Sequence, residues 1–67
     1  MSTYRELQKA IDAAQRESEA SQEPYAVVEW VSGGRHYLVR KLAKAQRLVL
    51  KHPEAAIKAK FYPGTLA

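Results

Sequence analysis

The chain has 67 residues, no cysteine and a formal net charge of +4 at neutral pH. This length makes a single domain, residues 1–67, with a small core, and the absence of cysteine excludes disulfides and thiolate metal sites. No apolar stretch reaches the roughly 20 residues that a membrane-spanning helix needs. We therefore expect a soluble, cytoplasmic protein with no membrane partner.

An amphipathic helix is predicted at about residues 3–18. Thr3 and Glu6 fit a capping box, with Thr3 as N-cap and Glu6 three positions later. The polar segment 18–24 ends in a proline and predicts a loop. Side chains that recur at spacings of three and four mark the inner face of the helix: Tyr4, Leu7, Ile11, Ala14 and Ser18.

A β-hairpin is predicted at residues 25–40. The segments 25–31 and 35–40 are rich in β-branched and aromatic residues, which favour strands. Gly33 and Gly34 lie between them and suit a two-residue turn, because glycine tolerates positive φ at both central positions.

Two registers of this hairpin are open. The two-residue turn gives these pairs: Trp30 with Tyr37, and Val28 with Val39. A three-residue loop would shift the pairing by one residue and place Trp30 opposite His36. We prefer the first register because it groups the apolar residues on one face of the sheet.

A second helix is predicted at about residues 41–51, because a proline at position 53 disfavours helical backbone at residue 52. Residues 35–67 contain eight basic residues and one acidic residue, whereas residues 1–34 contain three and six. Four cations recur at helical spacing within ~60° of one another: Arg40, Lys44, Arg47 and Lys51. Ordinary solvated helices mix charges, so this stripe indicates an anionic partner, and the alternative is a merely solvated face.

The segment 55–62 alternates between apolar and basic or polar residues and predicts a third strand, followed by a short tail. The rival prediction is a helix over 54–60, since these residues also favour helix. The preferred order is α-β-β-α-β: a small α+β domain whose three-stranded sheet has both helices packed on one face. Arg35, Lys58 and Lys60 are expected to extend the basic stripe.

No pattern of catalytic or metal-ligating residues stands out. His36 and His52 are the only histidines, and neither has a serine or carboxylate at a catalytic spacing. We therefore expect a non-enzymatic protein with no metal and no cofactor. Trp30 and Tyr37 are expected in the core, and Tyr62 is the best candidate for an exposed aromatic residue.

The stretch Gly34–Leu38, followed by a basic helix, resembles the wing and following helix of phage excisionase or MerR-like domains. There is no room for a recognition helix between the first helix and the hairpin, so no residue role is carried over. The small, cysteine-free layout is also similar in kind to phage or mobile-element accessory proteins that bind host machinery.

The sequence is compatible with two functions. The first is a nucleic-acid-binding module that contacts the DNA or RNA backbone without strong sequence specificity. The second is an inhibitor or adaptor that docks its basic face or a sheet edge on an acidic protein surface. The acidic first half also allows self-association into a homo-oligomer.

Overall fold

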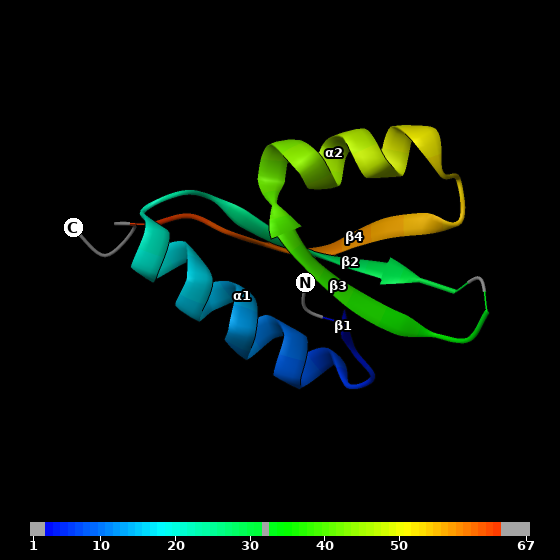
Figure 1. Cartoon of the computed structure of the whole chain (residues 1–67), viewed down its shortest axis with the longest axis horizontal. Coiled ribbons are helices and arrows are strands. Elements are labelled where there is room, and N and C mark those ends of the chain that lie inside the picture. Colours follow the sequence, from blue (N-terminus) through cyan, green and yellow to red (C-terminus); the bar gives the residue numbers. More distant parts are fainter. Residues whose placement is uncertain (1–2, 32, 64–67) are drawn as a thin grey trace.

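A four-stranded antiparallel sheet lies between two helices in the computed structural model, which describes residues 3–31 and 33–63 (Figure 1). The strand order across the sheet is β1-β3-β2-β4. Ser32 of the expected turn and the tail at 64–67 lie outside the described residues. The elements in chain order are β1 (Thr3–Tyr4), α1 (Leu7–Ser21), β2 (Tyr25–Trp30), β3 (His36–Lys41), α2 (Leu42–Lys51) and β4 (Ala55–Phe61).

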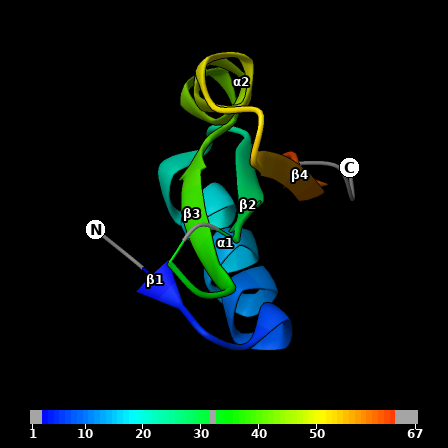
Figure 2. The ribbon, with the colours of Figure 1, turned by 90° about the vertical axis from the view of Figure 1, so that its right-hand side faces the viewer.

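The two helices cover opposite faces of the sheet, as the end-on view in Figure 2 shows. The α+β class is confirmed, but the expected packing of both helices on one face is wrong. The reason lies in β2, where Val27 packs under α1 and its neighbour Val28 packs under α2. Both valines are fully buried, and a strand buried on both faces is a continuous apolar run instead of an alternating one.

The hairpin adopts the register that we did not prefer. Trp30 lies opposite His36, and Val27 lies opposite Val39. Grouping the apolar residues on one face was the wrong criterion, because this register supplies apolar side chains to both covered faces. The glycines behave as expected, with φ of 77° at Gly33 and 109° at Gly34.

The first helix begins later than predicted, because residues 3–4 form a strand. Thr3 and Tyr4 pair with β3 opposite Leu38 and Tyr37, which adds a fourth strand to the expected three. Glu6 is the N-cap residue and makes no side-chain capping hydrogen bond. The predicted capping box is therefore wrong, and the Glu6 carboxylate instead pairs with Lys9 at 3.2 Å.

The helix α1 also continues past the predicted loop start and joins the sheet through Ser18. This side chain is only 1% exposed. Its hydroxyl donates to the Glu23 carbonyl at 2.9 Å and lies 3.3 Å from the Phe61 carbonyl. Gln22 then ends the helix in the left-handed conformation, with φ of 58°. One buried hydroxyl thus connects α1 to both the following loop and β4.

The third predicted strand is confirmed as β4, and the rival helix over 54–60 is wrong. The strand contains a bulge, because Val27 pairs with Ala59 while Val28 pairs with Ile57. The extra residue is Lys58. As a result Ile57 packs on the α2 side of the sheet and Ala59 on the α1 side, although simple alternation puts them on one face.

Candidate functional site

Three cations form the outer surface of α2, and we call Lys44, Arg47 and Lys51 the α2 basic face. All three side chains are exposed. The helix Leu42–Lys51 contains no acidic residue. None of the ion pairs formed among the described residues involves these three cations. Within this part of the chain, no carboxylate forms an ion pair with any of the three.

The helix that carries this face is fixed by its buried side and by both ends. Ala45 is fully buried against β2 and β4, so the cations point outward. At the first turn, the Leu42 N–H donates to the Pro24 carbonyl at 2.9 Å. Directly after the last turn, the ring centroids of His52 and Trp30 are 4.8 Å apart. The basic face is thus presented on a rigid element.

Arg40 belongs to β3 and not to the helix, since α2 begins at Leu42. It is opposite Ala26 in the sheet, and Ala26 is buried under Ala45. Opposed residues of antiparallel strands share a face, so Arg40 lies on the α2 side. Its guanidinium donates to the Val39 carbonyl at 2.9 Å. The predicted stripe is therefore divided between the end of a strand and a helix.

Lys60 lies on the same side by the same reasoning, because it is opposite Ala26 from the other neighbouring strand. Arg40 and Lys60 therefore flank Ala26 where α2 begins. Lys60 is exposed and has no ion pair among the described residues. Tyr62, two residues later, is 50% exposed, as expected for that aromatic residue.

Arg35 and Lys58 do not extend the α2 basic face. Both pair with Glu29, with nitrogen–oxygen distances of 3.5 Å. Glu29 is opposite Tyr37, whose side chain belongs to the α1 side of the sheet. Glu29 is only 17% exposed at its side chain, so these two cations share one half-buried carboxylate on the far face.

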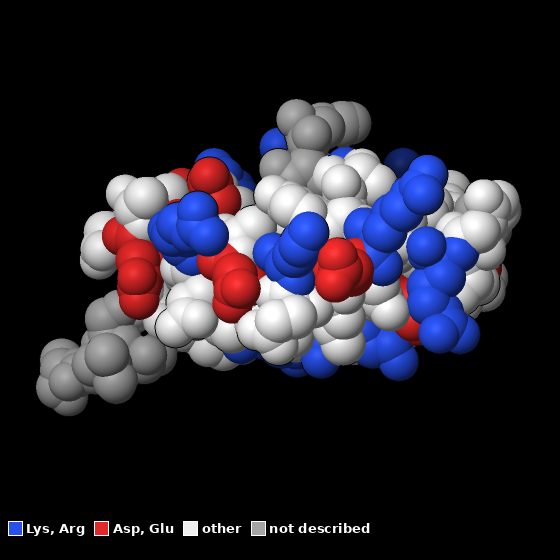
Figure 3. All heavy atoms as spheres, turned by 90° about the horizontal axis from the view of Figure 1, so that it is seen from below, with Lys and Arg blue, Asp and Glu red and all other residues white. Residues whose placement is uncertain are grey.

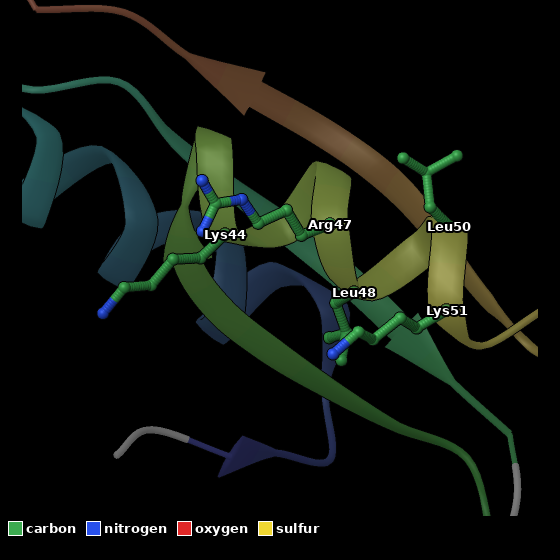
Figure 4. Close-up of a pocket in the computed structure, with 5 residues that line it drawn as sticks. All are labelled: Lys44, Arg47, Leu48, Leu50 and Lys51. Atoms are coloured by element: carbon green, nitrogen blue, oxygen red, sulfur yellow. The ribbon is translucent and has the colours of Figure 1, made fainter.

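Leu50 is the part of this surface that the sequence did not predict. Its side chain is apolar, yet it is 85% exposed. Leu50 and Leu48 line a shallow hollow of about 410 Å³ together with the α2 basic face. Figure 4 shows Leu48 and Leu50 pointing to different sides of α2, with the long cationic side chains extending along the helix. The surface is therefore apolar as well as cationic.

Lys41 lies next to this surface, but its positive charge is partly compensated by a neighbouring carboxylate. Its ammonium is 3.1 Å from the Glu23 carboxylate. The hydrogen bond that Lys41 donates to the Glu23 carboxylate and the negative charge of that carboxylate raise the pKa of Lys41 above its ordinary value. Lys41 therefore stays protonated at neutral pH and contributes less net positive charge than the three cations of α2.

The opposite face of the molecule has a different charge pattern. Figure 3 views it from the α1 side, where acidic and basic side chains alternate. Helix α1 contains two basic and three acidic residues: Lys9, Arg16, Asp12, Glu17 and Glu19. Only the α2 side therefore presents a helix with charges of one sign.

Within residues 3–31 and 33–63, no three histidine, aspartate or glutamate side chains come together as a metal site would require. No helix of the same residues is both long and apolar enough to cross a bilayer. Comparison with known proteins finds no matching family, no matching curated protein and no matching solved structure. The functional argument therefore depends on this surface itself.

Proposed function

We propose that the protein is a non-enzymatic, cytoplasmic binding module whose α2 basic face docks on a polyanion, the phosphate backbone of a nucleic acid. The observation that supports this most directly is a helix with three exposed cations and no acidic residue. Lysine and arginine that meet phosphates release condensed counterions, which drives binding at low salt. Arg40 and Lys60, on the same side of the sheet, extend the contact.

The dimensions of the face suit this partner. Seven residues separate Lys44 from Lys51, which corresponds to roughly 10 Å along the helix axis. One strand of DNA carries a charge about every 3.4 Å of axis, so the face meets about three phosphates. Contacts of such cations with phosphates carry no sequence information directly. Binding should therefore depend little on sequence.

The test compares two charge reversals that change the net charge equally. Lys44→Glu with Arg47→Glu alters the α2 basic face, and Lys9→Glu with Arg16→Glu alters α1. Binding of a labelled oligonucleotide, followed by fluorescence anisotropy at low salt, should weaken about a hundredfold in the α2 double variant. The α1 variant should change binding much less, because its face already mixes both signs. Equal losses in both variants would show that only net charge matters and would overturn the proposal.

A second candidate is an acidic protein surface, and the exposure of Leu50 favours it. An apolar side chain surrounded by cations suits a partner that offers both carboxylates and apolar groups. In that case the α2 double variant no longer binds the acidic protein partner. The purified wild-type protein then shows only weak nucleic-acid binding that disappears at moderate salt. Sedimentation of the protein alone tests the remaining option, self-association between the acidic and basic halves.

A further inference from the structure

Two hollows on the surface adjoin at Lys44. The first is the one lined by the α2 basic face, Leu48 and Leu50. The second has a volume of about 400 Å³ and lies where β3 passes into α2. Its lining residues are Tyr25, Val39, Arg40, Lys41 and Lys44. Because Lys44 lines both hollows, they adjoin at this side chain, and we call the two hollows together the path.

Both hollows of the path combine cationic surface with apolar or aromatic surface. Each hollow contributes cations, and each contributes apolar or aromatic groups beside them. In the first hollow the apolar groups are Leu48 and Leu50, and in the second the main one is the ring of Tyr25, because Val39 is only 7% exposed. A ligand that fills the path must therefore offer negative charge and apolar surface at closely repeated intervals.

We propose that the path binds single-stranded nucleic acid in preference to duplex. This inference depends on the proposed function and specifies its ligand. A single strand exposes base faces next to its phosphates, and proteins that bind it combine a cationic groove with aromatic or apolar contacts. A duplex keeps its base faces stacked inside and presents mainly phosphates to such a surface. Against a duplex, Leu50 would remain exposed to water.

The ends of the path differ in how their cations are held. At the β3 end, Arg40 is oriented by its hydrogen bond to the Val39 carbonyl, and Lys41 by its contact with Glu23. At the α2 end, no ion pair of the described residues restrains Lys44, Arg47 or Lys51. The β3 end therefore offers pre-positioned donors, and the α2 end offers cations that adjust to the bound backbone.

The experiment compares a labelled oligothymidylate of about twelve nucleotides with a duplex of the same length, by anisotropy at one salt concentration. The single strand should bind about tenfold more tightly. Leu50→Ser should weaken single-strand binding about fivefold, because the apolar contact is lost, and should weaken duplex binding much less. Val31→Ser is the matched control, since Val31 is also exposed but lines neither hollow.

The outcomes separate this inference from the proposed function. If the duplex binds as tightly as the single strand or more tightly, the single-strand preference is wrong. The proposed function still stands in that case, provided that the α2 double variant weakens duplex binding. Absence of binding to both forms at low salt overturns both. If Leu50→Ser and Val31→Ser change single-strand binding equally, the apolar groups do not contact the bases and the inference is wrong.

Discussion

The two helices of this domain cover the same sheet, yet they differ in what they bury and what they expose. Helix α1 has 15 residues and fully buries Ala10 and Ala14 on one side, while mixing both charge signs on the other. Helix α2 has 10 residues and exposes cations together with Leu50. Because α1 shows that a surface of mixed sign is compatible with this fold, the single-sign surface of α2 is not a structural requirement. This difference is the reason why we propose α2, and not α1, as the binding surface.

The largest effects should come from the two neighbouring valines that support the two helices. Val27→Ala and Val28→Ala should each lower the free energy of unfolding by about 2–3 kcal/mol, because each leaves a cavity in a small core. Urea denaturation followed by both circular dichroism and Trp30 fluorescence measures this. Coincident transitions are expected in both variants. A separate early transition in Val28→Ala would mean that α2 unfolds independently and is not a rigid binding element.

A smaller effect should follow from the hydroxyl that joins α1 to β4. Ser18→Ala should lower the free energy of unfolding by about 1–2 kcal/mol, since it leaves the carbonyls of Glu23 and Phe61 without this buried donor. Ser21→Ala is the matched control on the same helix, because its hydroxyl donates to Glu17 at an exposed site. Thermal unfolding of both variants measures the contrast. Equal melting temperatures would show that α1 does not depend on the Ser18 contact.

The smallest change in stability should accompany a variant that makes α2 resemble α1. Ala43 is exposed in the first turn of α2, four residues before Arg47. Ala43→Glu should raise the free energy of unfolding by about 0.3–1 kcal/mol, through the helix dipole and the pairing with Arg47. The same carboxylate should weaken polyanion binding about fivefold. Ala43→Gln, of similar size but neutral, should retain binding; if it weakens binding as much as glutamate does, the effect is steric.

The sequence predicted the parts of the fold that depend on local pattern. The helical periodicity of α2, the strand propensity of β4 and the positive φ of both hairpin glycines are local properties, and the structure has a helix, a strand and positive φ at these places. The register of the hairpin depends instead on how many faces of the sheet are covered, which no single segment specifies. The run Ala26–Val28 was the available signal, because consecutive apolar residues, in place of alternating ones, indicate a strand covered on both sides.

The sequence likewise predicted only part of the candidate site, because only some of its features depend on local pattern. The cations of α2 follow from helical spacing, and the structure exposes all three. The assignment of Arg35 and Lys58 to that patch depended on strand order and on the bulge, neither of which the local pattern encodes. Both residues instead meet Glu29 on the other face. The exposure of Leu50 likewise depends on where α2 rests on the sheet, and not on the composition of the helix.

The bulge in β4 has a further consequence for how the molecule meets other copies of itself. β4 is the outermost strand on its side of the sheet, and an outer strand can act as a template for aggregation through its unpaired backbone groups. A bulge interrupts the regular backbone spacing that such pairing needs. In β4 the interrupting residue is a lysine, and Lys60 places a second positive charge two residues later. The bulge and the positive charges therefore both disfavour pairing of this outer strand with β4 of another copy.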